Sequence, residues 1–278
     1  MIKGIISNYN KTSASFSIEY NGVKTYFYLP NKLKETFKNS LQNGMRISFC
    51  TNEKTIIRRN IIMHEVEFLV SLSFINSLRP IYDIGKLNES VLEILLKNEY
   101  FLVLDLEISM APFFEKNYIG EIIQAGFVLV SQTREIIEEV DYFLKTKTGV
   151  ILNPKIFKFI RASKEEYFTK AVSYNVFYEK LKEILIKYNP KIVVWGNNDI
   201  ISLDDSYNLY DLPALTNQYS FINLLNLHKN YYGQKEDLGL YAAYSIYYYV
   251  EESQDHDALH DAQITKEILF AFIDRLKK

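Results

Sequence analysis

Cysteine is almost absent from this chain, and so are long apolar runs. The single cysteine, Cys50, excludes an internal disulfide and a cysteine-rich zinc site, and it fits a reducing cytoplasm. No apolar run reaches the roughly 18 residues that span a bilayer, and the first residues lack the apolar segment of a signal peptide. We therefore expect a cytoplasmic protein with no membrane partner. Its oligomeric state is left open by the composition.

Net charge is also small, at −2 for 278 residues, so the overall balance does not indicate a nucleic-acid partner. The charge is unevenly divided along the chain, however. Residues 1–80 contain 11 Lys or Arg and 5 Asp or Glu, whereas the remaining residues contain 21 and 29. A basic N-terminal part can neutralise phosphates while an acidic part recruits cations, although two soluble domains can also differ in this way by chance.

A short apolar run near the middle of the chain carries two acids. Residues 101–104 are apolar and predict a buried strand, which continues into Asp105 and Glu107. Side chains two residues apart lie on the same face of a strand, so the two carboxylates should be neighbours. Such a pair resists burial unless a cation lies between them, and a divalent metal fits that need. Two solvated acids on an edge strand are the alternative.

Two later segments supply further candidate residues. The apolar residues 191–195 end in a glycine turn followed by Asp199, which by itself is most simply a helix cap. Near the C-terminus, His256 precedes a helical pattern whose first turn contains Asp261. An acid in that position also has an ordinary role, because it interacts favourably with the helix dipole. The full constellation is Asp105, Glu107, Asp199, His256 and Asp261.

This constellation resembles the DEDDh family of 3′–5′ exonucleases, within the ribonuclease H-like superfamily. Asp105 and Glu107 match the Asp-x-Glu motif, Asp199 matches the single Asp of the second motif, and residues 256–262 match His-x-Ala-x-x-Asp-Ala. The Trp-Gly-x-x-Asp form of the second motif is most similar to the ERI-like branch, which trims RNA 3′ ends, and to its bacterial relatives. The resemblance covers about residues 98–278.

The resemblance implies a two-metal hydrolase of phosphodiester bonds. Asp105, Glu107, Asp199 and Asp261 would hold two divalent cations, Mg²⁺ or Mn²⁺. His256 would be the general base, because a neutral imidazole accepts a proton well at about pH 7. The implied activity is release of nucleoside 5′-monophosphates from the 3′ end of single-stranded nucleic acid, with RNA favoured.

The same residues are compatible with alternative substrate contacts and alternative functions. The family often has a threonine after the glutamate, where this chain has Ile108, and Ser109 is then the candidate contact to the terminal nucleotide. The phosphate chemistry does not distinguish RNA from DNA, so a DNA-directed exonuclease for repair or proofreading is the nearest alternative. A catalytically inactive nucleic-acid-binding module and a protein–protein adaptor are the others.

The N-terminal part predicts a small β-barrel. Asn21-Gly22 between two alternating segments is a strong hairpin signal, and a second Asn-Gly precedes another strand. Five short strands in so short a segment indicate a barrel. The strands are expected over residues 2–7, 14–20, 23–29, 45–49 and 56–63, with a short helix at 33–37.

The order of these strands resembles a cold-shock-type OB-fold. Such barrels bind single strands by stacking bases on aromatic side chains over a basic surface. Phe16, Tyr26 and Tyr28 are the candidate platforms. Aromatic residues that alternate along a strand more often pack a barrel core, which is the competing interpretation for each of them.

The second part of the chain alternates between strands and helices, which indicates the α/β class. We expect a ribonuclease H-like mixed sheet flanked by helices, preceded by a small all-β OB-like barrel. The expected division is 1–80 for the barrel, 81–98 for a linker with a short helix, and 99–278 for the exonuclease domain. The expected strands are 101–106, 122–130, 136–144, 191–195 and 220–223, and the expected helices are 170–187, 199–210, 238–250 and the C-terminal segment.

Overall fold

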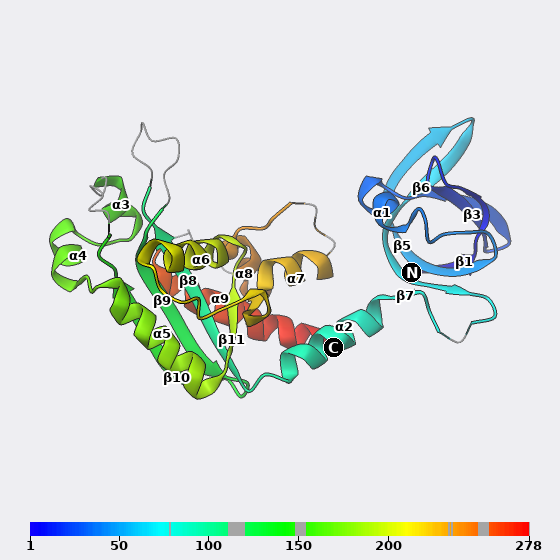
Figure 1. Cartoon of the computed structure of the whole chain (residues 1–278). Helices are drawn as coiled ribbons and strands as arrows, with labels where there is room; N and C mark the ends of the chain where they lie inside the picture. The colour runs from blue at the N-terminus through cyan, green and yellow to red at the C-terminus, as the bar shows by residue number, and fades with distance from the viewer. Residues whose placement is uncertain are drawn as a thin grey trace. The chain divides into compact units, whose positions relative to one another are not determined.

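The computed structural model describes residues 1–77, 79–110, 120–147, 154–232, 234, 236–249 and 256–277. The chain divides into two compact units, Met1–Val91 and Leu92–Lys278, each with its own hydrophobic core (Figure 1). The division falls inside helix α2 (Ile84–Leu96), within the segment expected to be a linker. No helix in the described ranges is long and apolar enough to cross a membrane.

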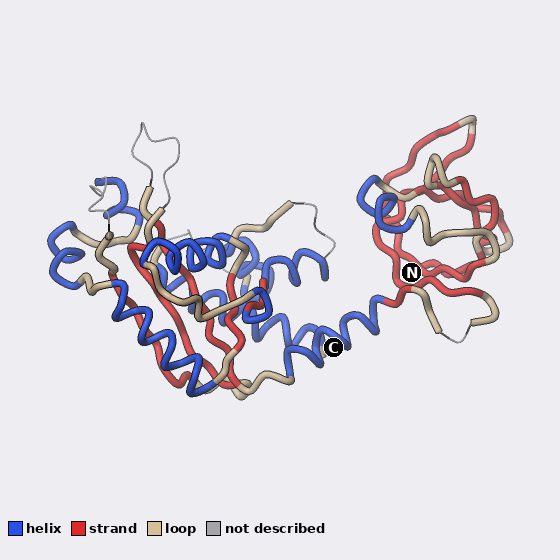
Figure 2. The backbone as a smooth tube through the Cα atoms, in the orientation of Figure 1, coloured by secondary structure: helices blue, strands red, loops and turns tan. Residues whose placement is uncertain are grey.

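The first unit is a β-barrel with one short helix, α1, followed by the first residues of α2. Its strands are hydrogen-bonded in the order β1-β5-β6-β4-β3-β2. β1 and β2 are consecutive halves of one strand interrupted at Ile6, so the two ends of this path meet and the sheet closes (Figure 2). The elements are β1 (Ile2–Ile5), β2 (Ser7–Asn10), β3 (Ser15–Tyr20), β4 (Val23–Tyr28), α1 (Asn31–Phe37), β5 (Met45–Arg58), β6 (Ile61–Phe74) and β7 (Tyr82–Asp83).

Alternation of apolar residues places one face of each barrel strand in the core. Phe16, Phe27 and Phe49 form an aromatic cluster there, with ring centroids 4.8–5.8 Å apart. β4 and β6 run parallel, whereas the other neighbouring pairs along the path are antiparallel. The closed ladder leaves few free backbone groups at its edges.

The expected separate strand at 56–63 is wrong. Ile56 and Ile57 continue β5, and β6 begins at Ile61 and extends to Phe74. Arg59 and Asn60, both with positive φ, form the two-residue turn between these strands. The sequence pattern fails here because residues 51–55 are largely open to solvent on both faces, so apolar and polar residues no longer alternate.

The second unit contains a mixed sheet in the order β10-β9-β8-β11-β12. β8, β9 and β10 are antiparallel neighbours, while β11 runs parallel to both β8 and β12. The sheet thus has its central strand, β8, paired on both sides. The strands are β8 (Tyr100–Ile108), β9 (Ile122–Ser131), β10 (Ile136–Phe143), β11 (Lys191–Val194) and β12 (Phe221–Asn223).

Helices cover both faces of this sheet (Figure 1). Leu102, Leu104 and Leu106 of β8 belong to the core shared with α5 and α6. Phe101 of the same strand contacts Phe270 of α9 on the opposite face, with ring centroids 6.3 Å apart. The helices are α3 (Pro154–Phe159), α4 (Lys164–Lys170), α5 (Tyr174–Tyr188), α6 (Asn198–Tyr210), α7 (Leu224–Tyr231), α8 (Leu240–Tyr248) and α9 (Ala258–Leu276), with a 3₁₀ turn at Gln218–Ser220.

Most expected elements of this unit are present, but the helix expected at 170–187 begins later. α4 ends at Lys170, and Val172 is extended because it forms a bridge with Leu144 beside β10. The helix expected at 238–250 would end at Val250, and this residue lies outside the described residues.

Candidate active site

Asp105 and Glu107 lie near the carboxyl end of β8, in the centre of the five-stranded sheet. The four apolar residues before Asp105 are almost completely buried and fix the strand in place. Leu106, between the two acids, packs on the α5 side, so both carboxylates project to the α9 side. Glu107 is buried, and Asp105 keeps partial contact with solvent.

Asp199 reaches the same place from the first turn of α6, the helix that follows the neighbouring strand β11. In the described part of the sheet, β11 pairs with β8 only as far as Val103, so the β8 backbone beyond that point has no strand on this side. The Asp199 carboxylate accepts a hydrogen bond from the Leu106 N–H there, at 2.9 Å. Because Leu106 lies between Asp105 and Glu107, this bond holds the third acid beside the first two.

A glycine lets α9 approach the cluster. Gly126 of β9 lies directly opposite Asp105 in the antiparallel register. A Cβ atom at Gly126 would overlap the backbone of Ala258 and Leu259, the first residues of α9. The helix therefore begins in direct contact with the strand beside Asp105, which only a residue without a side chain permits.

The first turn of α9 presents Asp261 to the other acids. Asp257 caps the helix by accepting a hydrogen bond from the His260 N–H at 2.9 Å. Asp261 is buried, and its Oδ1 accepts a hydrogen bond from the Tyr241 hydroxyl at 2.7 Å. Tyr241 belongs to α8, so two helices fix the direction of this carboxylate.

His256 completes the group immediately before α9. Ligand atoms of Glu107, His256 and Asp261 all lie within 4.8 Å of one another. The His256 Nδ1 is 3.8 Å from the Glu107 Oε1. The imidazole stacks on the ring of Phe159 of α3, with centroids 3.8 Å apart and an angle of 19° between planes. The backbone of His256 has φ of +48°, a conformation that non-glycine residues adopt infrequently.

Burial and repulsion from neighbouring carboxylates raise the pKa of every acid in the cluster. Burial, followed by Asp261 and Asp199, raises the pKa of Glu107 to about 8. Burial raises the pKa of Asp199 to about 7, although the Leu106 hydrogen bond opposes the shift. Burial and the charge of Asp199 raise the pKa of Asp105, and burial raises that of Asp261. At neutral pH the four groups resist simultaneous ionisation.

A divalent metal fits this donor set. Four carboxylates converge, and no Lys or Arg among the described residues forms an ion pair with any of them. Oxygen ligands of this kind suit Mg²⁺ and Mn²⁺. A bound cation would remove the repulsion that raises these pKa values.

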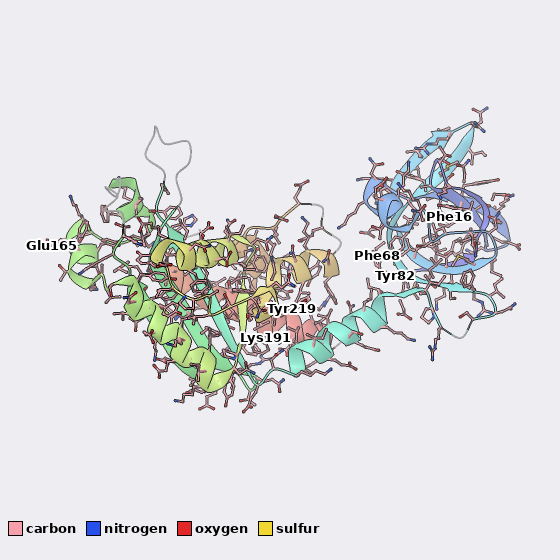
Figure 3. All side chains as sticks on the ribbon, in the orientation of Figure 1. Phe16, Phe68, Tyr82, Glu165, Lys191 and Tyr219 are labelled. Carbon is pink, nitrogen blue, oxygen red and sulfur yellow. The ribbon has the colours of Figure 1, made fainter. Side chains whose placement is uncertain are left out.

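The four residues considered for substrate contact divide between the two units. In the second unit, Ser109 is buried, and its Oγ accepts a hydrogen bond from the Glu121 N–H at 2.8 Å. In the barrel, Phe16 is only 1% exposed and lies inside the core, so it cannot stack on a base (Figure 3). Aromatic packing explains this outcome, as the competing interpretation held.

Tyr26 and Tyr28 lie on the outer face of β4, and both are half-buried. The Lys24 Nζ is 5.8 Å from the centroid of the Tyr26 ring, and the Arg58 guanidinium is 6.0 Å from that of Tyr28. The Tyr28 hydroxyl donates a hydrogen bond to Glu65 at 2.7 Å. Two aromatic rings with two cations thus share one face of the barrel.

Sequence reasoning missed the residues that hold the cluster in place. One of them is Gln124, which is fully buried in β9. Its amide donates hydrogen bonds to Asp141 at 2.9 Å and to Asp257 at 3.3 Å, so it links β9, β10 and the cap of α9. The available signal in the sequence was a single Gln within the otherwise apolar run 122–130. Phe159 and Tyr241 carried no signal, because their partners are distant in sequence.

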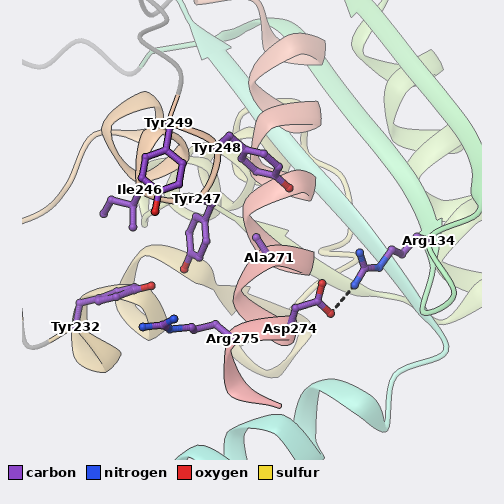
Figure 4. Close-up of a pocket in the computed structure, with 9 residues that line it drawn as sticks. All are labelled: Arg134, Tyr232, Ile246, Tyr247, Tyr248, Tyr249, Ala271, Asp274 and Arg275. Carbon is purple, nitrogen blue, oxygen red and sulfur yellow. Dashed lines mark hydrogen bonds and ion pairs between the residues drawn. The ribbon is translucent and has the colours of Figure 1, made fainter. Parts of the chain in front are cut away.

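A separate hollow of about 560 Å³ lies at the other end of α9 from Asp261 (Figure 4). Tyrosines of α8 and Arg275 line it, together with Arg134 from the β9–β10 turn. Arg134 is paired there with Asp274 at 2.6 Å. The hollow contains none of the clustered acids, so it is distinct from the candidate active site.

Known proteins resemble this chain to different degrees. No family model matches it. The Bacillus subtilis (strain 168) protein named "Probable 3′-5′ exonuclease KapD" is 26% identical over 179 residues, which cover 64% of this chain and 85% of that protein.

Solved structures with a similar fold are also nucleases. The nuclease domain of 3′hExo, described as a DEDDh family member bound to rAMP, has a TM-score of 0.55 and 16% identity over 64% of this chain and 93% of that one. A 3′-exonuclease structure on 3′-end-specific recognition of a histone mRNA stem-loop has a TM-score of 0.56 and 14% identity, covering 68% and 71%. Cell-death related nuclease 4 (CRN-4) has a TM-score of 0.52 and 19% identity, covering 64% of each chain. About two thirds of this chain therefore has the mixed α/β fold of these solved exonucleases.

Proposed function

We propose that this protein is a metal-dependent 3′–5′ exonuclease that acts on single-stranded nucleic acid and favours RNA. One observation carries the proposal: Asp105, Glu107, Asp199 and Asp261, which are far apart in the sequence, converge with His256 at one end of the sheet. The similarity to a protein named as a 3′–5′ exonuclease supports the same activity.

The four carboxylates would hold two divalent cations, which when bound stabilise the charge that develops on the attacking and leaving oxygens of a phosphodiester. Their raised pKa values show that the ionised carboxylates lack a counter-charge, which a cation would supply as it displaces their protons. Tyr241 orients Asp261 within the set, and the Leu106 N–H orients Asp199.

His256 is the proposed general base. Its Nδ1 lies near Glu107 and its ring stacks on Phe159, so the imidazole is held at the edge of the acid cluster. From there it can take a proton from a water molecule that attacks the last phosphodiester bond. Attack at the last bond releases a nucleoside 5′-monophosphate.

The barrel is proposed to bind the single strand. Its strand order, with β4 parallel to β6 and the remaining pairs antiparallel, supports an OB-like assignment. Tyr26 and Tyr28 provide aromatic surfaces beside Lys24 and Arg58, a combination suited to bases and phosphates. Ser109 stays the candidate contact to the terminal nucleotide, and its Oγ also accepts a hydrogen bond from the Glu121 N–H at the end of β8.

The test is digestion of matched RNA and DNA oligonucleotides labelled at the 5′ or the 3′ end, with Mg²⁺, with Mn²⁺ or with a chelator. We expect a 3′ label to be released at once as a mononucleotide and a 5′ label to shorten progressively, with RNA consumed faster. No product from any strand with either metal would refute the catalytic proposal. Faster digestion of DNA would instead favour the DNA-directed alternative.

A further inference from the structure

The hairpin formed by β5 and β6 extends beyond the barrel (Figure 1). β1 pairs with β5 only up to Phe49, and β4 pairs with β6 only from Met63 onward. In the described register, the segment from Thr55 to Ile62 is therefore a two-stranded ribbon with no third strand. Exposed apolar side chains on an isolated ribbon are unfavourable in water and often mark a surface that contacts a partner.

Two isoleucines lie side by side near the tip of this ribbon. Ile57 pairs directly with Ile62 across the strands, so their side chains are neighbours on one face. Ile57 is 73% exposed and Ile62 is 58% exposed. Arg58, the next residue, lies over Tyr28 on the other face, so the isoleucine pair faces away from the surface proposed to bind single strands.

Two cations, Lys54 and Arg59, lie on either side of Ile57 along the chain. Both are exposed, and neither lies within 4 Å of a carboxylate in the part of the chain that is described. Arg59 occupies the turn itself. Unpaired cations next to a protruding apolar pair complement a partner that combines negative charge with an apolar surface.

We propose that the tip of the β5–β6 hairpin is a wedge for base-paired nucleic acid. Ile57 and Ile62 contact the terminal base pair where a duplex meets a single strand, and Lys54 and Arg59 contact the flanking phosphates. Aliphatic side chains insert between base steps, whereas stacking on single bases favours flat aromatic rings. The use of the wedge rests on the proposed exonuclease function, because it opens paired 3′ regions that a single-strand site cannot accept.

Binding at the junction can be tested without digestion. The full chain carrying Asp105→Asn is mixed with a duplex that has a 3′ single-stranded extension and 2-aminopurine in its first base pair. We expect fluorescence to rise as that pair opens. The added substitutions Ile57→Ser and Ile62→Ser should reduce the rise about tenfold, because the apolar contact is lost.

A matched control distinguishes loss of the wedge contact from a general effect of replacing exposed isoleucines by serine. Ile186 and Ile94 are 75% and 59% exposed on helices α5 and α2, close to the values for Ile57 and Ile62. Serine at both of these positions should leave the fluorescence response unchanged. Arg59→Glu provides an independent variant, expected to weaken junction binding and to lower its salt dependence.

Digestion by the otherwise unmodified chain completes the experiment. We expect the Ile57→Ser, Ile62→Ser protein to digest an unpaired strand at the normal rate and a strand with a paired 3′ region about tenfold more slowly. Equal rates on the paired strand and an unchanged fluorescence response would overturn the proposal. So would a change from dimer to monomer in the double variant, which would assign the pair to self-association. Failure to digest any strand, with the fluorescence response intact, would refute the exonuclease function but not the wedge.

Discussion

Asp105 is repelled by four neighbouring acids, Asp199, Asp261, Glu107 and Asp257. Burial, followed by the charges of Asp199 and Asp261, raises its pKa. A side chain held in this way is unfavourable for the metal-free fold and useful only when a cation is bound. The Asp105 carboxylate should therefore lower the stability of the metal-free protein and be required for activity.

Asp105→Asn should abolish digestion and stabilise the metal-free protein. Replacing the carboxylate by an amide of similar shape removes the repulsion while keeping the packing. A gain of about 1 kcal/mol corresponds to about 2–4 °C in Tm for a domain of this size. Thermal unfolding in EDTA and digestion in Mg²⁺ measure the two effects. A lower Tm in EDTA would contradict the repulsion argument.

The pH dependence of stability follows from the same residues. Because the pKa of Glu107 in the folded chain is about 8 and that of Asp199 about 7, both bind protons that the unfolded chain releases at about pH 4. Their contribution to stability is complete below the unfolded pKa and is lost as pH rises through the folded values. The Tm of the metal-free protein should fall between pH 6.5 and pH 8.

Two comparisons check that pH prediction. Mg²⁺ should remove the decline, since ligation replaces protonation. His228, which is buried and whose pKa is lowered to about 4, acts in the opposite sense but only below its unfolded pKa of about 6.5. A Tm that rises from pH 6.5 to pH 8 in EDTA would show that the acids are not repelling one another.

At the scale of elements, the site depends on how closely α9 approaches β9. The Gln124 amide links Asp141 of β10 to Asp257, the cap of α9, while Gly126 removes the side chain that would separate helix and strand. The helix start is thus fixed by one polar link and one missing side chain. A small displacement there would move Asp261 and His256 away from β8.

Gly126→Ala should reduce both stability and activity strongly, because its Cβ would overlap the backbone of Ala258 and Leu259. Gly239→Ala is the matched control. Gly239 precedes α8 with φ of −61°, and nothing lies within 4 Å of a Cβ placed there. We expect a lower Tm and loss of digestion for the first variant and near-normal values for the second. Similar behaviour of the two would exclude close helix approach as the cause.

At the scale of the whole molecule, the two units have separate hydrophobic cores. Phe16, Phe27 and Phe49 belong to one, and the leucines of β8 with α5 belong to the other. All the clustered acids lie in the second unit. Metal binding should therefore stabilise one unit by mass action and leave the other unchanged.

Calorimetry of the full chain should show two unfolding transitions. Mg²⁺ should raise the Tm of one of them only. Phe49→Ala, which empties part of the barrel core, should lower the Tm of the other, by the equivalent of about 3–5 kcal/mol. If both changes affect the same transition, or if a single transition responds to both, the units do not unfold independently.

The parts of the fold that could be predicted from the sequence are those with a regular local pattern of apolar residues. β8 was predictable because four apolar residues precede Asp105, and α9 because its apolar residues repeat at helical spacing. The β5–β6 hairpin was not, because residues 51–55 do not alternate. Phe16 shows a further limit: alternation placed it on one face of a strand, and only the closed barrel made that face the interior.

The sequence by itself determined the five candidate residues, through their resemblance to a family pattern, and the order of strands and helices, because hydrophobic periodicity is a local property. Tertiary structure alone decided that Asp199 meets the Leu106 N–H, that Gly126 admits α9 and that Phe159 stacks on His256. These contacts join residues that are distant along the chain. No local pattern specifies them, because they form only once the sheet has brought its neighbours together.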